Sequence, residues 1–275
     1  MNSADRDDVL EDITLLREEM GATDEEAQKK LLGWMSAPDA RVRAAAAEAT
    51  WEYYFIPAIL ERAMRLVRQD ADPLVQQAAL VGIGRVMQEG QIDEIEETAI
   101  ESIDSEMDLD PKIYWRVFHF LLDAASDESI PVGVRRFAVE SLGFAGERSD
   151  VVALLHEWYG RPEPEAKRSA VFGMGNSRSD AFASQIVRHI DDPDREMRLV
   201  AIRAAGHAAC EDAIDRVLAA SRSKEVAVRR AAAEALGGYG GDDVLDRLEE
   251  MQDDADESVC DAADKAIESA RDREL

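Results

Sequence analysis

The sequence predicts an all-α protein built as a solenoid of paired helices. The first observation is a repeat: the segment DPDREMRLVAIRAAG at 192–206 is followed 31 residues later by SKEVAVRRAAAEALG at 223–237. In each copy an apolar–basic pair, two small residues and a closing glycine are spaced so that they share one helical face. The second observation is a series of aspartates that alternates with these segments at the same period. Two alternating signals at a single period indicate two helices in each repeat.

In the N-terminal half, capping residues and helix-breaking residues indicate where the helices begin and end. Thr23 and Glu26 have the spacing of a capping box, so a helix is expected to begin near Asp24. The repeat fails after its second copy, because the next clear basic position, Arg135, lies 59 residues beyond Gln76. The helices expected in this half are Asp8–Met20, a helix from Asp24 to the break at Ala37-Pro38-Asp39, Ala40–Trp51, Phe55–Arg68, a helix opened by Asp72-Pro73, Ile92–Ile103 and Pro111–Ala125.

Register returns in the C-terminal half, where a basic residue recurs at steps of 31 or 32. We call this position the anchor, and Cys260 occupies it in the last helix. Ala201 and Ala232 are expected to contact the adjoining repeat. The intervening aspartates are expected to cap the second helices, and Gly206 and Gly237 to be left-handed C-caps. The anchors are Arg135, Lys167, Arg198 and Arg229, the aspartates are Asp150, Asp180, Asp212 and Asp243, and the last helix is Glu257–Arg271.

These elements predict a single array, because no low-complexity linker interrupts them. The final helix is dense in Asp and Glu and suits the polar end that a solenoid needs. The expected divisions are N-terminal cap helices at 1–39, regular repeats at 40–89, an irregular unit at 90–126, regular repeats at 130–253 and a C-terminal capping helix at 254–275.

The net charge of −27, from 32 basic and 59 acidic residues, bounds the possible partners. DNA or RNA is not expected as a direct ligand, because the phosphates would be repelled. The chain has 26 arginines and only 6 lysines, which fits either a high-salt cytoplasm or an arginine-rich genome with a solvated acidic surface. With no signal peptide at the N-terminus and no long apolar run, a cytoplasmic protein without a membrane segment is expected.

The repeat pattern D-P-D-x-x-[VM]-R-x-x-A-x-x-A-[LA]-G resembles the short HEAT repeat, in the variety named after phycobilisome bilin lyases. The resemblance covers about residues 40–88 and 130–270. It implies a right-handed α-α superhelix of the HEAT/armadillo type, with about seven helix pairs including irregular ends. It also implies that first helices lie on the convex side and that second helices line the concave side.

The resemblance raises three classes of enzyme. HEAT-type deoxyhypusine hydroxylases hold a di-iron centre with several His-Glu pairs, but here only His156 is followed by Glu, so that activity is rejected. HEAT-like DNA glycosylases use a basic groove, which the net charge opposes. Bilin lyases share the repeat most closely, yet no residue marks a tetrapyrrole site. Cys210 and Cys260 have no metal-ligand spacing and are expected to be buried or half-buried free thiols.

These observations favour a non-catalytic scaffold or adaptor that binds a protein on its concave surface. The alternative is a bilin-lyase-like or other small-molecule-handling HEAT enzyme. No catalytic, cofactor or metal-binding residue is predicted, and a monomer is expected. The predicted partner, with an apolar anchor and basic residues, would meet a stripe on the second helices. This stripe consists of Ala153, Ala183, Asp215 and Asp246, flanked by Trp158 and Arg188.

Each of three features of the sequence allows two interpretations. The anchors Arg43, Arg135, Arg198 and Arg229 form either a basic ladder for an anionic ligand or structural bonds to loop carboxylates such as Asp192, Asp194 and Glu225. Trp158 is either a flank of the stripe or core. The aromatic segment Tyr114–Phe120 either fills the space where the repeat breaks or exposes anchors for a partner.

Overall fold

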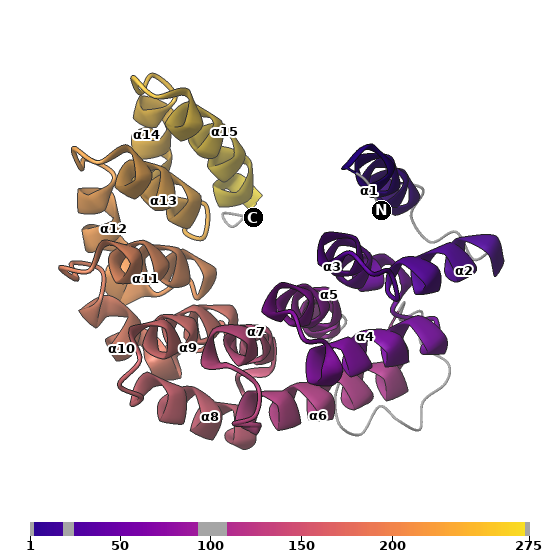
Figure 1. Ribbon diagram of the computed structural model, residues 1–275. Helices are drawn as coiled ribbons and strands as arrows, with labels where there is room; N and C mark the ends of the chain where they lie inside the picture. Colours follow the sequence, from indigo (N-terminus) through magenta and orange to yellow (C-terminus); the bar gives the residue numbers. More distant parts are fainter. Residues whose placement is uncertain (1–2, 19–24, 93–108, 273–275) are drawn as a thin grey trace. The chain divides into compact units, whose positions relative to one another are not determined.

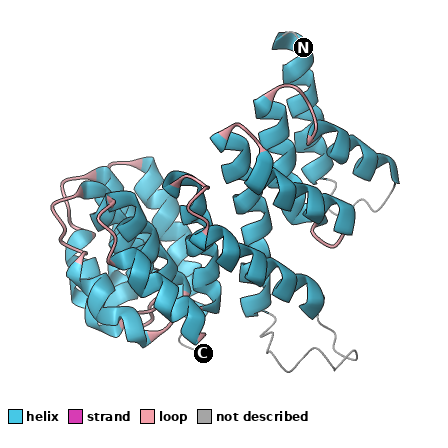
Figure 2. Ribbon diagram, turned by 60° about the horizontal axis from the view of Figure 1, so that its bottom comes forward, coloured by secondary structure: helices cyan, strands magenta, loops and turns pink. Residues whose placement is uncertain are grey.

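The computed structural model describes residues 3–18, 25–92 and 109–272, and all regular structure within these ranges is helical (Figures 1 and 2). The chain divides into two compact units, Met1–Leu142 and Gly143–Leu275, which we call unit 1 and unit 2. The helices of unit 1 are α1 (Ser3–Glu18), α2 (Glu25–Trp34), α3 (Ala40–Glu48), α4 (Pro57–Gln69), α5 (Pro73–Ile92), α6 (Pro111–Ser126) and α7 (Val132–Leu142). Those of unit 2 are α8 (Ser149–Tyr159), α9 (Pro164–Asn176), α10 (Ala183–Arg188), α11 (Arg195–His207), α12 (Ile214–Ala220), α13 (Val226–Leu236), α14 (Asp242–Met251) and α15 (Glu257–Asp272).

The predicted all-α architecture of stacked helix pairs is confirmed. In unit 2 the anchors lie on the first helices α9, α11, α13 and α15, and the second helices α8, α10, α12 and α14 alternate with them. Single 3-10 turns precede α10 and α12, which shortens both of these helices. In unit 1 the first helices are α3, α5 and α7, and the second helices are α4 and α6. Most of the helix expected at Ile92–Ile103 falls outside the described residues.

Small residues bring the first helices of unit 2 into close contact. A Cβ atom added to Gly206 would lie 2.5 Å from the carbonyl oxygen of Ala235, closer than the 3.0 Å that real Cβ atoms keep. Ala201 and Ala232 have no exposed surface, as expected for residues facing a neighbouring helix. The same approach recurs at the repeat period, from Gly175 to Ala204, from Gly206 to Ala235 and from Gly237 to Ala266.

The prediction that Gly206 and Gly237 are left-handed C-caps is wrong. Gly206 lies inside α11, and Gly237 follows α13 with a φ of −61°. The left-handed positions are instead Arg178, with a φ of 51°, and Ala209, with a φ of 47°, just beyond the ends of α9 and α11. The glycines are therefore required by the short distance between helices rather than by their backbone angles.

Replacing Ala209 with glycine is expected to raise the free energy of unfolding by about 0.5–1 kcal/mol, because glycine adopts a positive φ without a Cβ penalty. Urea denaturation measures this change. Ala208 offers a matched control, since its φ is −79° and the same substitution there should lower stability. Equal effects at the two positions would show that the left-handed conformation at Ala209 carries no strain.

The aspartates of the second series do not cap the second helices: Asp150 and Asp243 lie in the first turns of α8 and α14, and Asp180 and Asp212 lie in the 3-10 turns before α10 and α12. Ser179, not Asp180, accepts the capping hydrogen bond before α10. Side-chain caps by aspartate occur elsewhere, where Asp39, Asp110 and Asp194 accept from the backbone N–H two residues on. In those loops the aspartate has extended backbone angles and can fold back onto the first turn, which a residue already inside the helix cannot do.

In unit 2 the first helices form one layer and the second helices another, and neighbouring helices are closer together in the first of these layers. Each first helix contacts the next, from α9 to α11, from α11 to α13 and from α13 to α15. Figure 1 places α9, α11 and α13 on the inner side of unit 2 and α10, α12 and α14 on its outer side. The layer with the shorter spacing must lie on the inside of a curve, and the glycine contacts make the first helices that layer. The expectation that second helices line the concave side is therefore wrong for unit 2.

Candidate functional site

Four of the anchor residues, Arg43, Arg198, Arg229 and Cys260, form structural hydrogen bonds within the solenoid. Arg43, Arg198 and Arg229 all donate from Nη1 to the backbone carbonyl six residues earlier, at 2.8–3.0 Å. The Cys260 thiol, at the same register, donates to the carbonyl of Asp254 over 3.2 Å. Each arginine also binds a carboxylate in the loop before the next first helix. These pairs are Arg43 with Asp70, Arg198 with Glu225 and Arg229 with Asp254.

Two of these pairs are bidentate. Arg229 donates from Nε and Nη2 to the two carboxylate oxygens of Asp254, at 2.7 and 2.8 Å. Arg43 makes the same fork with Asp70, at 2.8 and 2.9 Å. In both cases the guanidinium holds the pKa of the carboxyl below its usual value, chiefly through these hydrogen bonds. The ladder interpretation of these anchors is replaced by a clamp that joins consecutive repeats.

A second polar link joins α8 to the end of α10. The hydroxyl of Tyr159 lies 2.8 Å from Nε2 of His189, whose Nδ1 lies 2.7 Å from the carboxylate of Asp192. The His189 ring lowers the pKa of the Asp192 carboxyl by hydrogen bonding to it. Because Arg198 binds the backbone carbonyl of Asp192, this chain continues into the anchor clamp and fixes the same loop.

The residues predicted to meet a partner are only partly accessible. Ala153, Asp215, Asp246 and Arg188 are exposed and Ala183 is half-buried, so these five remain candidates on the second helices. Trp158 has no exposed surface, and the Arg161 guanidinium lies 4.9 Å from its ring centroid. Its place as a flank of the stripe is therefore wrong. The side chain fills the space between α8 and its neighbours, which is the core interpretation.

The first helices of unit 2 present a different surface. The position five residues after each anchor is at least partly exposed and changes its chemistry from helix to helix. We call these residues, together with His207, the first-helix face. The Arg203 Nε donates to Glu234 over 2.7 Å, and the His207 ring meets the Phe172 ring edge-on with centroids 6.2 Å apart. The four register positions are Phe172, Arg203, Glu234 and Lys265.

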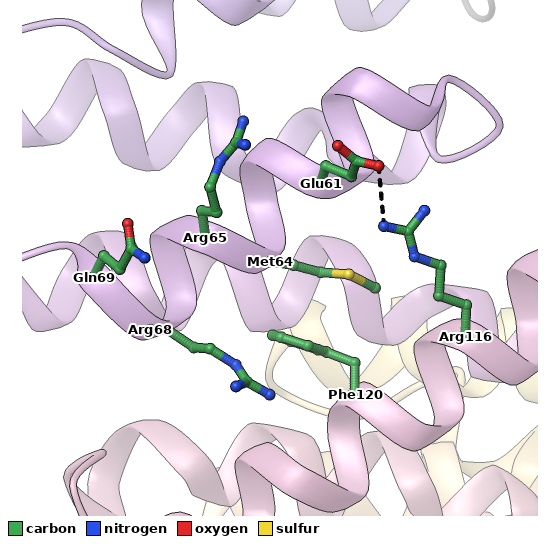
Figure 3. A pocket seen from close by; sticks show the side chains of 7 residues that line it. All are labelled: Glu61, Met64, Arg65, Arg68, Gln69, Arg116 and Phe120. Carbon is green, nitrogen blue, oxygen red and sulfur yellow. Dashed lines mark hydrogen bonds and ion pairs between the residues drawn. The ribbon is translucent and has the colours of Figure 1, made fainter.

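A pocket of about 280 Å³ lies between α4 and α6 in unit 1 (Figure 3). We call it the α4–α6 pocket. Met64 and Phe120 supply its apolar surface, and Arg65, Arg68 and Arg116 contribute cationic groups. The lining side chains of α4 are Glu61, Met64, Arg65, Arg68 and Gln69, and those of α6 are Arg116 and Phe120.

The arginines of this pocket are held loosely. Arg116 donates to Glu61 over 3.2 Å, and Arg68 lies 3.6 Å from Asp123, all four side chains being 45–74% exposed. The Arg68 guanidinium also lies 5.2 Å from the centroid of the Phe120 ring. Exposed ion pairs of this kind contribute little to stability. Their cationic groups can therefore exchange a protein carboxylate for that of a ligand at small cost.

This pocket is not predicted from the sequence. The segment Pro57–Gln69 carries three arginines and one acid in a strongly acidic chain, and this local reversal of charge was a usable signal. The aromatic segment contributes to the core through Tyr114 and Phe118, which are buried. Phe120, however, remains half-buried and reaches the pocket. Its pairing with α4 depends on how the irregular region folds, which no local pattern reveals.

The described part of the chain offers little other candidate chemistry. Within residues 3–18, 25–92 and 109–272, no group of three or more His, Cys, Asp or Glu side chains could hold a metal ion. None of the helices described there combines the length and the apolar character needed to cross a membrane. Cys210 is a buried free thiol and Cys260 a half-buried one, as predicted, and burial raises the pKa of Cys210.

The match to a family model supports the repeat architecture in the C-terminal part of the chain. The family model for HEAT repeats matches residues 183–268. No curated protein matches the sequence. Human deoxyhypusine hydroxylase in complex with glycerol has a TM-score of 0.41 at 15% identity, covering 98% of this chain and all of that one. A designed armadillo repeat protein has a TM-score of 0.38 at 14% identity, and the match covers 77% of this chain and 99% of that one. An engineered protein has a TM-score of 0.39 at 16% identity, and the match covers 98% of this chain and 89% of that one. The periodic helix pairs, the anchor clamps and the family match at residues 183–268 together support a HEAT-type repeat architecture.

Proposed function

We propose that the protein is a non-catalytic scaffold that binds a protein partner on the first-helix face of unit 2. The observation that carries this proposal is a contrast between two sets of positions at one period. The buried contact positions keep glycine or alanine in every repeat. The position five after each anchor changes from Phe172 to Arg203, Glu234 and Lys265. A constant frame with variable outward residues suits recognition of an extended protein surface.

The chemistry of this face suits a partner with both apolar and charged groups. Phe172 and His207 supply an aromatic patch at the α9–α11 step, where a partner side chain could be buried. Arg203 and Glu234 are already paired with each other, so they would mainly set the register of a partner rather than its affinity. The net charge of −27 would accelerate the approach of a partner carrying basic residues and disfavour nucleic acid.

The proposal is tested with a partner captured on the tagged protein and its affinity measured for two double variants. One changes the first-helix face by Phe172→Ser and Lys265→Glu. The control changes the second-helix stripe by Ala153→Ser and Arg188→Glu, so both variants shift the charge by the same amount. The face variant should weaken binding by about tenfold or more, equal to about 1.4 kcal/mol, and the control by less than about twofold.

The opposite ranking would move the partner to the second-helix stripe and contradict the proposed surface. If both variants bound as tightly as the parent while keeping its melting temperature, neither surface would serve the partner and the proposed site would be abandoned.

A further inference from the structure

We propose that the α4–α6 pocket binds an acidic protein segment that inserts one apolar side chain between the two helices. This surface lies in unit 1 and does not depend on the first-helix face of unit 2. Three features of the pocket favour this occupant: its size, the arrangement of its arginines and the contrast between their charge and that of the whole chain.

The size of the pocket favours a single side chain over a complete small molecule. Its volume of about 280 Å³ falls just below the 300–1,000 Å³ that is usual for pockets that enclose a small ligand. Met64, only 9% exposed, and the half-buried Phe120 form the apolar part of the lining, and the volume has room for one aromatic or branched side chain. The rest of a peptide would remain on the surface, along the groove between α4 and α6.

The arginines stand on both walls of this groove. Arg65 and Arg68 are three residues apart on α4, and Arg116 is on α6. Figure 3 shows Arg68 reaching toward Phe120, and Arg116 reaching across to Glu61. Arg65 is exposed and forms no ion pair with any described residue, so its guanidinium is available to a carboxylate. Carboxylates on either side of an inserted apolar residue would find a guanidinium on each wall.

The charge of the rest of the chain selects a short acidic segment over a nucleic acid. Fixed charges act over about 8 Å at physiological ionic strength, so a short peptide in the groove feels mainly the local arginines. A polynucleotide would extend its phosphates beyond the groove over a chain with a net charge of −27. The aromatic ring of Phe120 with Arg68 against it also offers a stacking surface for an aromatic anchor.

The test measures binding of a fluorescein-labelled peptide, Glu-Asp-Phe-Asp-Glu, to the full chain by fluorescence anisotropy. Arg65→Glu should weaken binding about tenfold or more, because it replaces the available cation with a repelling carboxylate. Arg188→Glu is the matched control: Arg188 is exposed on a second helix of unit 2 and likewise forms no ion pair with a described residue. That variant should change the affinity by less than about twofold.

A second variant is expected to strengthen binding of the peptide. Glu61→Gln removes the carboxylate that occupies Arg116 and should tighten binding about threefold. Replacing the central Phe of the peptide with Ala should weaken binding about fivefold, because the anchor is lost. Each variant is compared with the parent by its melting temperature, so that loss of binding is separated from loss of folding.

Three results would overturn the proposal. One is equal binding of the peptide to folded Arg65→Glu and to the parent. Another is equal binding of a peptide in which Lys replaces the acidic residues. The third is tighter binding of a ten-nucleotide oligothymidylate than of the acidic peptide, which would assign the groove to nucleic acid.

Discussion

Replacing Gly206 with alanine is expected to lower the free energy of unfolding by about 3 kcal/mol, the upper part of the range for overpacked cores. The added Cβ atom would meet the backbone of Ala235, with the carbonyl oxygen 2.5 Å away. A backbone atom cannot move aside as the end of a flexible side chain can, so α11 and α13 would have to separate. Urea denaturation of the parent and the variant measures the loss.

The sign of this effect is diagnostic, because glycine to alanine normally stabilises a helix. Gly33 provides the control: it lies in α2, is exposed, and has no atom within 4 Å of an added Cβ. There the same substitution should raise the free energy of unfolding by about 0.5–1 kcal/mol. If both variants were stabilised, the first helices would not be held together by the close contact at Gly206.

Replacing Arg229 with alanine is expected to cost about 2–3 kcal/mol at neutral pH, since charged hydrogen bonds are lost and Asp254 keeps its charge. Arg229 and Asp254 are only 15% and 11% exposed, so water compensates poorly. The adjacent Arg230 is the control. Its pair with Glu234 is 3.3 Å long with both side chains more than a third exposed, so Arg230→Ala should cost less than about 0.5 kcal/mol.

The cost of Arg229→Ala should also depend on pH. Arg229 lowers the folded-state pKa of Asp254 below its unfolded value, so the ion pair stabilises the fold fully above the unfolded pKa. This contribution is lost as the pH falls through the lowered folded-state pKa. The difference in stability between parent and variant should therefore be largest above about pH 5 and shrink at lower pH. A difference that grew on acidification would contradict the clamp.

The repeat architecture could be predicted from the sequence because its signals are local and recur. Arg198 and Arg229 occupy the same position in consecutive repeats, which fixes the period. Each donates a hydrogen bond to a backbone carbonyl six residues earlier, in the loop before its own helix. The glycine at Gly206 was predicted to be special, but for the wrong reason. A glycine near a helix end can serve a left-handed turn or a close approach, and only the distance to the next helix separates the two.

The candidate sites were harder to predict because they depend on which side of a helix meets the next layer. Counting from an aspartate leaves Trp158 either as a flank of the stripe or as core, and only the packing of α8 shows that it is buried. The α4–α6 pocket joins residues such as Arg68 and Phe120, which are separated by the irregular region of the chain. Where the period fails, sequence spacing no longer reports which helices become neighbours.

The proposal that unit 2 binds a partner on its first helices is tested most directly by hydroxyl-radical footprinting of the free and partner-bound protein. His207 and His156 form a natural comparison, because both are exposed, one on the first-helix face and the other on the second helix α8. Binding should reduce oxidation of His207 and of the neighbouring Phe172 and leave that of His156 unchanged. Protection of His156 with unchanged oxidation of His207 and Phe172 would contradict the proposal.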